Sequence, residues 1–221
     1  MDRLLKIENA TLYQQSQLIL QNINLEVNQG DFIYIVGKVG SGKTTIFKSI
    51  YGAHPSKSGN IFFDNTNVNK IKRNKLYLHR RKIGMIFQEF HLLEDRTVSE
   101  NLEFVLRATN WKNALTIKNH VTTTLEWCEI EHLKDKYPNE LSGGEKNIVS
   151  IARAIINNPK LIIADEPTQN LDPETAEKQM KLFERINNDG TTIIMATHNY
   201  SILNKFPHTT YRCENMTLNR V

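Results

Sequence analysis

The chain has 221 residues and a formal net charge of +4, from 28 lysines and arginines against 24 aspartates and glutamates. This length allows one large α/β domain with a full core, and so small a positive charge does not by itself indicate a nucleic-acid surface. Two cysteines, Cys128 and Cys213, are too few for a disulfide framework or a zinc site, so we expect free thiols in a reducing compartment.

The apolar runs of the sequence have the length of strands. The longest are 32–36, 161–164 and 192–196, whereas a membrane span requires about 20 apolar residues. The opening MDRLLKIEN does not resemble a secretory leader. We therefore expect a cytoplasmic protein whose contact with a membrane is indirect, through a partner.

The first 88 residues predict strands around one helix. Residues 4–13 and 18–27 alternate between apolar and polar side chains, as half-buried strands do. FIYIV at 32–36 predicts a buried strand, TTIFKSIY at 44–51 a helix, and KIGMIFQ at 82–88 a further buried strand.

The motif GKVGSGKT, at 37–44, follows the predicted strand 32–36 and leads into the predicted helix 44–51. It matches G-x-x-x-x-G-K-[ST]. Glycines let backbone N–H groups surround phosphate oxygens, Lys43 adds a positive charge, and the Thr44 hydroxyl can bind Mg²⁺. A chance glycine-rich turn is the alternative, but the strand–loop–helix context favours nucleotide triphosphate binding. The predicted binding residues are Gly37, Lys38, Val39, Gly40, Ser41, Gly42, Lys43, Thr44 and Thr45.

KIKRNKLYLHRRK, at 70–82, is rich in lysine and arginine. Such a run is typical of a solvated helix face, and contact with an acidic lipid or partner is the alternative. The sequence leaves both open.

From 89 to 158 the pattern becomes helical. Residues 97–111 and 117–130 predict two helices, and Ile148, Ile151, Ala152 and Ile155 predict a third that ends before Pro159. That third helix begins with LSGGE, at 141–145. Its two glycines sacrifice about 1 kcal/mol each relative to alanine.

Two explanations account for Gly143 and Gly144. Ser142 and Glu145 match an S-x-x-E capping box, in which case the glycines are part of a loop. Alternatively, bare N–H groups at a helix N-terminus form a site for an anion. These five residues alone do not decide between the two.

After residue 160 strands and helices alternate again. LIIADEP at 161–167 predicts a strand, Asp172 and Pro173 predict a helix start before an end near Gly190, and TTIIMATH at 191–198 predicts the next strand. Asp165 and Glu166 follow a buried strand, where ligands of parallel sheets lie. Asp165 can hold Mg²⁺ through water and Glu166 can activate the attacking water, although a strand-end salt bridge or a helix cap is the alternative.

Other polar residues stand at similar positions. His198 ends one predicted strand, where a γ-phosphate contact is required, and Gln88 ends another, where its amide could touch Mg²⁺ and water. The Tyr13 ring could stack on a base, or pack in the core. A lone histidine is more often structural, but ordinary sheet packing does not explain several polar strand ends directed at one place.

Together these patterns predict a mainly parallel sheet with an inserted helical subdomain. We expect a single domain over 1–221, with a nucleotide-binding core and β subdomain at 1–88 and 159–221 and a helical subdomain at 89–158.

GKVGSGKT, Gln88, LSGGE, LIIADEP, NLD and His198, in this order, resemble the nucleotide-binding domain of ABC ATPases over essentially the whole chain. The resemblance implies a P-loop NTPase core with an N-terminal antiparallel β subdomain, ATP and Mg²⁺ as ligands, and a head-to-tail homodimer around two ATP. It implies that Ser142, Gly143 and Gly144 contact the γ-phosphate of ATP held by the other subunit, and that Glu145 and Asp172 also bind nucleotide. The catalytic residues that it implies are Glu166, His198, Gln88 and Lys43, with Thr44, Gln88 and Asp165 at the metal.

The chain departs from the family pattern at two places. Lys146, Asn147 and Ile148 stand where members usually have Gln-Gln-Arg, and Gln169 stands where glycine is usual. Neither change removes a catalytic group, but both could alter the affinity of the dimer.

Within the family, residues 92–111 and 164–175 are most similar to the FtsE group of cell-division ATPases. That resemblance implies an integral membrane partner of the FtsX type, control of peptidoglycan hydrolysis, and a place on the cytoplasmic face of the bacterial inner membrane. Alternatives are the ATPases of lipoprotein release or macrolide export, a soluble ABC protein acting on nucleic acid or ribosomes, and a non-hydrolysing scaffold. We do not expect nucleic acid as a partner. The candidate residues for coupling to the membrane partner are Phe90 to Thr97.

Overall fold

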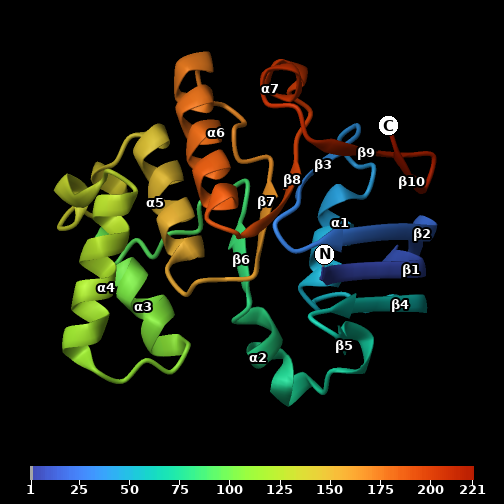
Figure 1. Cartoon of the computed structure of the whole chain (residues 1–221), viewed down its shortest axis with the longest axis horizontal. Coiled ribbons are helices and arrows are strands. Elements are labelled where there is room, and N and C mark those ends of the chain that lie inside the picture. The colour runs from blue at the N-terminus through green and yellow to red at the C-terminus, as the bar shows by residue number, and fades with distance from the viewer. Residues whose placement is uncertain (1) are drawn as a thin grey trace.

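The computed structural model describes residues 2–221, which form two sheets and a group of helices (Figure 1). The strands are β1 (Arg3–Gln14), β2 (Gln17–Asn28), β3 (Phe32–Val36), β4 (Ser58–Phe63), β5 (Thr66–Asn67), β6 (Ile83–Ile86), β7 (Leu161–Asp165), β8 (Thr192–Ala196), β9 (Thr209–Glu214) and β10 (Thr217–Arg220). The helices are α1 (Lys43–Ile50), α2 (Leu76–Arg80), α3 (Val98–Ala108), α4 (Ala114–Trp127), α5 (Gly143–Ile155), α6 (Pro173–Asn188) and α7 (Tyr200–Lys205).

The smaller sheet is antiparallel, with strand order β2-β1-β4-β5. The larger has the order β10-β9-β3-β8-β7-β6, and all of its pairs are parallel except β10–β9. This confirms the predicted fold class, an α/β domain with a mainly parallel sheet and an antiparallel β layer near the N-terminus.

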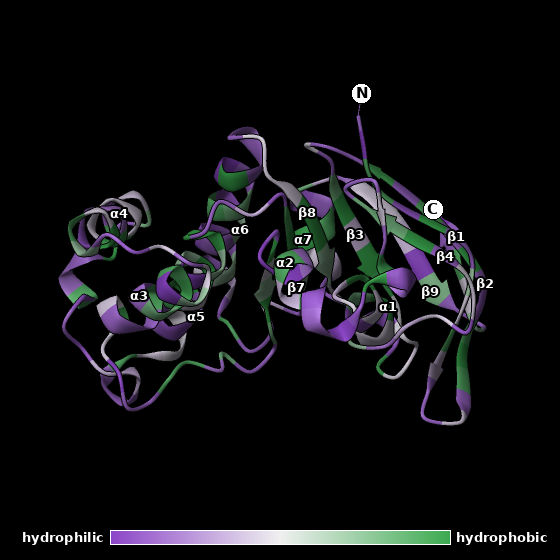
Figure 2. Cartoon of the chain, turned by 90° about the horizontal axis from the view of Figure 1, so that it is seen from below, coloured by the Kyte–Doolittle hydropathy of each residue, from purple (hydrophilic) through white to green (hydrophobic). Residues whose placement is uncertain are grey.

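Helix α1 lies between the two sheets. Alternation along β3 divides its side chains: Ile33 and Ile35 face α1 and the antiparallel sheet, while Phe32, Tyr34 and Val36 face the other side. The strands β3, β7 and β8 are accordingly green over much of their length in the hydropathy view (Figure 2). A strand buried on both faces reads as a continuous apolar run, which is why these strands could be predicted from composition alone.

Helices α3 and α4 share a separate apolar cluster with α5. Val98, Leu102 and Leu106 recur every four residues along α3, and they meet a similar row from α4. Helix α5 contributes to two clusters, because Val149 and Ala152 face α3 and α4 while Ile151 faces the large sheet and α6. The predicted boundaries at 88/89 and 158/159 stay predictions.

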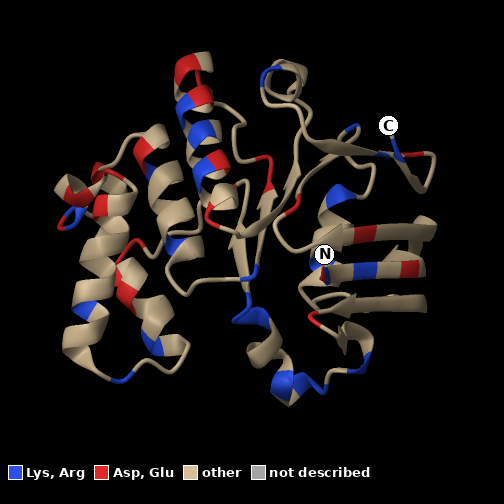
Figure 3. Ribbon diagram, viewed as in Figure 1, with Lys and Arg blue, Asp and Glu red and all other residues tan. Residues whose placement is uncertain are grey.

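The basic stretch forms a 3-10 turn (Arg73–Lys75) and the short helix α2, at the lower edge of the molecule in Figure 3. Buried His79 anchors α2, because its Nε2 donates to the Ile50 carbonyl oxygen at 2.7 Å. Lys70, Lys72, Arg73 and Lys75 are exposed, as a solvated face requires. Among residues 2–221, no helix combines the length and apolar character needed to cross a membrane.

Candidate functional site

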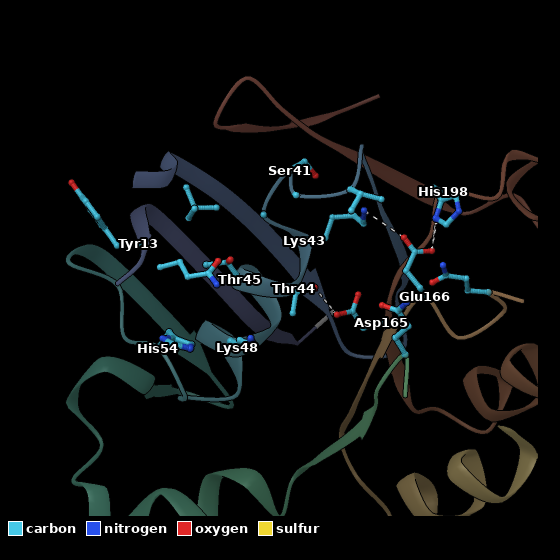
Figure 4. Close-up of a pocket in the computed structure, with 17 residues that line it drawn as sticks. Tyr13, Ser41, Lys43, Thr44, Thr45, Lys48, His54, Asp165, Glu166 and His198 are labelled. Atoms are coloured by element: carbon cyan, nitrogen blue, oxygen red, sulfur yellow. Dashed lines mark hydrogen bonds and ion pairs between the residues drawn. The ribbon is translucent and has the colours of Figure 1, made fainter. Parts of the chain in front are cut away.

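A cavity of about 350 Å³ lies at the carboxyl ends of the parallel strands, beside the N-terminus of α1 (Figure 4). Ligands of parallel sheets bind at this edge. Predicted site residues that line it are Tyr13, Val39, Gly40, Ser41, Gly42, Lys43, Thr44, Thr45, Gln88, Asp165, Glu166 and His198. The structure therefore brings together residues that are up to 185 positions apart in the chain (Tyr13 to His198).

The loop before α1 requires glycine at specific places. Gly42 caps the helix with a φ of 111°, in the left-handed region, and an added Cβ would approach Ile19 and Leu20 side-chain atoms to 2.8 and 3.0 Å. Gly40 also has a positive φ, of 81°, but an added Cβ there would meet nothing within 4 Å. Gly37 and Lys38 do not line this cavity; their carbonyl oxygens accept hydrogen bonds from Lys43 Nζ at 2.8 and 3.3 Å.

Thr44 and Asp165 form an oxygen pair at the bottom of the cavity. Thr44 Oγ1 donates to Asp165 Oδ2 at 2.7 Å, and the Asp165 side chain is buried. Burial raises the pKa of the Asp165 carboxyl, while the hydrogen bond from Thr44 acts in the opposite direction. A cation at this position would favour the charged carboxylate.

Glu166 occupies a strained backbone position, with a φ of 51°. Its N–H donates to the Ala196 carbonyl oxygen of β8 at 3.0 Å, which fixes the residue beside the end of the neighbouring strand. Its carboxylate lies between two bases: Oε1 is 3.4 Å from Lys43 Nζ, and Oε2 is 2.9 Å from His198 Nδ1 (Figure 4). The Glu166 side chain is 10 % exposed and that of Lys43 is 7 % exposed, so their opposite charges compensate one another in a dry environment.

The residues at this site fit a triphosphate and a divalent cation. Gly40 and Gly42 have positive φ values, a backbone conformation found in loops whose N–H groups bind anions, and the buried Ser41 Oγ has no hydrogen-bond partner among the described residues. Lys43 supplies a cation, and the hydroxyl of Thr44 and carboxylate of Asp165 are the hard oxygen ligands that Mg²⁺ prefers.

Two predicted residues take positions that differ slightly from the expected ones. Strand β6 ends at Ile86 and β8 at Ala196, so Gln88 and His198 each lie two residues beyond a strand and yet line the cavity. The ring of Tyr13 carries the ammonium of Lys57 4.1 Å from its centroid. A base stacked on Tyr13 would therefore use the opposite face of the ring or displace Lys57.

The LSGGE residues and Asp172 do not line this cavity. The Ser142 hydroxyl accepts from Glu145 N–H at 3.3 Å and Glu145 Oε2 accepts from Ser142 N–H at 2.8 Å, which makes the predicted capping box of α5. Asp172 caps α6 by accepting from the N–H groups of Glu174 and Thr175.

Packing among residues 2–221 gives no reason for a glycine at position 143 and only a limited one at position 144. A Cβ added to Gly143 would meet nothing within 4 Å, and one added to Gly144 would meet only Thr175 Cγ2, at 3.2 Å. Their backbone conformation is not left-handed either. The capping box therefore explains Ser142 and Glu145 but leaves Gly143 without a role in the isolated chain.

Sequence reasoning missed four residues of the cavity, Gln14, Ile19, Lys48 and His54, and it noticed Gln169 only as a departure from the family pattern. Lys48 lies one helical turn after Thr44, so helix periodicity alone would have placed it on the same face. Ile19 and His54 come from β2 and from the loop after α1, and no local pattern marks them.

A second groove, of about 460 Å³, lies between the large sheet and the helices α3 and α5. Phe87, His91, Leu93 and Phe104 line it, together with Tyr77 and Arg80 of α2. Phe104 is 44 % exposed and Phe87 37 %, which is unusual for phenylalanine. Part of the segment predicted for coupling, Phe90 to Thr97, thus borders an open groove.

The chain is similar to well-characterised proteins over nearly its full length. The profile of the family described as ABC transporter matches residues 20–169. The cell division ATP-binding protein FtsE of Streptococcus pneumoniae (strain D39) is 42 % identical over 203 residues, covering 92 % of this chain and 88 % of that protein. FtsE of Bacillus subtilis is 43 % identical, covering 87 % and 84 %, and FtsE of Escherichia coli K12 is 35 % identical, covering 87 % and 86 %.

Solved structures of ATP-binding cassettes share the fold. The dimeric cassette MJ0796, in a post-hydrolysis state bound to ADP and Pi, superposes with a TM-score of 0.87 at 33 % identity, covering 98 % of this chain and 97 % of that one. CbiO1 of Clostridium perfringens, part of the transporter complex cbiONQ, gives 0.89 at 33 % identity, covering 99 % and 87 %.

Proposed function

Since the chain belongs to the ABC transporter family and is an ATPase, we propose that the cavity at Lys43 and Glu166 is its hydrolytic site and that it serves a membrane complex of cell division. The observation that carries the proposal is the convergence of Lys43, His198 and the Thr44–Asp165 pair around the carboxylate of Glu166. A cation, a carboxylate that can act as general base and an oxygen pair suited to a hard metal are the groups that phosphoryl transfer to water requires.

Each group then has a definite task. Backbone N–H groups of the loop from Val39 to Thr45, which lines the cavity, bind the phosphate oxygens, with Lys43 at the β/γ-phosphates. Thr44, Asp165 and Gln88 would hold Mg²⁺, which would neutralise charge on the phosphates. Glu166 accepts a proton from the attacking water, and His198, 2.9 Å from Glu166 Oε2, contacts the γ-phosphate.

The second half of each site comes from another copy of the chain. Ser142, Gly143, Gly144 and Glu145 lie at the exposed N-terminus of α5, outside the cavity of their own chain. A helix N-terminus favours an anion, and the open space at Gly143 leaves room for one to approach the backbone. We assign these residues and Asp172 to the ATP held by the partner subunit, in the manner of the dimeric relative bound to ADP and Pi.

The physiological role follows from the relatives. FtsE proteins of three organisms match most of this chain at 35–43 % identity. We assign to this chain an integral membrane partner of the FtsX type, a peripheral place on the cytoplasmic face of the membrane, and ATP-driven control of peptidoglycan hydrolysis. The groove lined by Phe87 and Phe104, with Phe90 to Thr97 at its edge, is where that partner docks.

Substitution Glu166→Gln tests the hydrolytic site. The amide keeps the shape of the side chain but no longer takes a proton, so we expect the turnover of ATP to fall by about 10²-fold or more while nucleotide still binds. Because hydrolysis no longer separates the subunits, this variant should sediment as a dimer with Mg²⁺ and ATP and as a monomer with ADP. Native turnover by Glu166→Gln, or a variant that stays monomeric with ATP and its membrane partner present, would contradict the proposal.

A further inference from the structure

A chain of buried amides connects α5 and α6 to the loop that carries Glu166. Gln179 Nε2, on α6, donates to Asn147 Oδ1, and Asn147 Nδ2, on α5, donates to the Pro167 carbonyl oxygen at 2.6 Å. Asn147 is 3 % exposed and Gln179 is 2 % exposed. Asn147 is one of the residues at which the sequence departs from its family, and the structure places its side chain inside the molecule.

The Pro167 carbonyl oxygen determines which group donates in each of these hydrogen bonds. A carbonyl oxygen only accepts, so the amide group of Asn147 must turn its Nδ2 toward Pro167 and its Oδ1 toward Gln179. Gln179 must then donate, and its own Oε1 is left buried without a hydrogen-bond partner among residues 2–221. An unpaired buried acceptor costs about 1–3 kcal/mol. A packing role alone would be filled better by apolar side chains at both positions.

The bond to Pro167 falls next to the strained residue of the site. Glu166 has a φ of 51°, and such a conformation persists only where its surroundings hold it. On the N-terminal side of this strained residue, its own N–H donates to the carbonyl oxygen of Ala196. On its C-terminal side, the Pro167 carbonyl oxygen accepts from Asn147 Nδ2. The Gln169 N–H also donates to the Glu166 carbonyl oxygen, at 3.1 Å. The carboxylate that faces Lys43 and His198 is thus held from β8 on one side and from α5 on the other.

We propose that Asn147 is a positioning residue of the ATPase: its hydrogen bond to Pro167 holds Glu166 in the geometry that activates water. The inference rests on the proposed function, in which Glu166 is the base. Asn147 lies one turn after Gly143 on α5. The helix that offers its N-terminus to the partner's ATP therefore also fixes the base of its own chain, so each chain links the two ATP sites of the dimer.

Three variants separate positioning from packing. Asn147→Leu keeps the size of the side chain and removes the bond to Pro167, so kcat should fall about tenfold with KM for ATP changed less than about threefold. Gln179→Leu leaves that bond in place and should lower kcat less than about threefold. In the double variant the apolar pair restores packing, so the melting temperature should recover while kcat stays as low as in Asn147→Leu.

Asn147→Asp gives a readout that a packing role would not move. Its carboxylate has no proton to donate to Pro167 O, whereas the protonated carboxyl does, and burial beside Glu166 raises the pKa of the introduced group. The ratio of its kcat to the wild-type kcat should therefore rise as the pH falls from about 9 to about 6.

The proposal is overturned if folded Asn147→Leu retains kcat within about twofold of wild type, or if the Asn147→Asp ratio is flat with pH. Recovery of kcat together with the melting temperature in the double variant would also overturn it, because packing would then account for the loss. Wild-type protein without Mg²⁺-dependent turnover would instead remove the proposed function itself, and the inference with it.

Discussion

At the scale of single residues, this chain departs from the most stable choice at two positions of the proposed ATP site. Glu166 has a left-handed backbone, which is unfavourable for a glutamate. Gly143 opens a helix although its conformation would allow any residue and nothing lies within 4 Å of an added Cβ. Local rules fail at both positions, and both belong to the proposed site.

Gly143→Ala should separate stability from function. Alanine is favoured over glycine in helices by up to about 1 kcal/mol, and the isolated chain has space for the methyl group, so the melting temperature should stay the same or rise. The methyl group would stand between the backbone and the partner's ATP. We expect the double variant Gly143→Ala/Glu166→Gln to require at least about tenfold more ATP to form a dimer than Glu166→Gln alone, since tenfold corresponds to only 1.4 kcal/mol.

Analytical ultracentrifugation of Glu166→Gln protein with and without Gly143→Ala, across a range of ATP concentrations in Mg²⁺, checks this expectation. Gly144→Ala is the matched comparison, because its Cβ would meet Thr175 Cγ2 at 3.2 Å and so should destabilise the monomer slightly. A Gly143→Ala protein that dimerises at the native ATP concentration would show that α5 does not contact nucleotide in trans.

Much of the site could be predicted from the sequence because phosphate chemistry imposes local spacing. GKVGSGKT places Lys43 and Thr44 through a continuous loop, and Asp165 and Glu166 follow a recognisable strand. Ile19 and His54 could not be predicted, because tertiary packing alone brings them to the cavity. Asn147 was noticed only as a departure, since its partners Pro167 and Gln179 become neighbours only when α5, α6 and β7 pack together.

At the scale of elements, an ion cluster fastens the two sheets together. Asp64, in the turn after β4 of the antiparallel sheet, binds Lys82 Nζ at 2.6 Å and Lys160 Nζ at 2.7 Å, just before β6 and β7 of the large sheet. The hydrogen bond from Lys160, followed by that from Lys82, lowers the pKa of the Asp64 carboxyl. The Asp64 side chain is only 21 % exposed, so solvent screens the cluster incompletely.

Asp64→Asn should reduce stability in a pH-dependent way. Because the folded-state pKa of Asp64 is lowered, the unfolded chain takes up a proton first, and stability from the cluster is present above the unfolded pKa and lost as the pH falls through the folded one. At pH 7 the variant should unfold about 1 kcal/mol more easily in urea, and the difference should disappear as the pH falls through the lowered folded-state pKa of Asp64. Asparagine tolerates the positive φ of 48° at this position, so the backbone is not strained.

The control is Asp135→Asn, which alters an exposed carboxylate outside the ion pairs of residues 2–221. It should leave the free energy of unfolding unchanged within error at every pH. An Asp64→Asn deficit that is constant from pH 7 to acid would mean that something other than the charge of Asp64 is lost.

The sequence predicts well those strands and helices that have a local sequence signal, and poorly those that form only by packing against another element. Strand β3 and the start of α6 match expectation because FIYIV and the Asp172–Pro173 cap are local signals. Helix α4 begins at Ala114, three residues before the predicted start, because Asn113 caps it. Strands β9 and β10 and helix α7 were not anticipated, since β9 is a strand by virtue of pairing with β3 and carries little periodicity of its own.

At the scale of the whole molecule, the proposed partner must reach the groove beside the large sheet. Exposed Glu94 and Asp95 lie on the segment that borders it. Reversing both charges, Glu94→Lys with Asp95→Lys, should abolish copurification of the membrane partner from detergent extracts, while ATP binding in the other cavity is unaffected. Partner recovery at the wild-type level would remove this segment from the interface.

The matched control reverses Glu126 and Glu129, which are exposed, lie near the end of α4, and do not line the groove. It changes the net charge by the same amount. Loss of the partner in this control as well would mean that overall charge, not the segment from Phe90 to Thr97, determines association.

On the proposed function, the ion pair between Lys43 and Glu166 links phosphate binding to the activation of water. The Lys43 ammonium, which would bind the phosphates, compensates the charge of the Glu166 carboxylate, which would accept a proton from water, so neither buried charge is left uncompensated. An arriving triphosphate exchanges one anion for another at Lys43 and, by the same movement, frees the base. Binding of the triphosphate and release of Glu166 from Lys43 would then be a single event. Glu166 would become available to activate water only when a phosphate lies beside it.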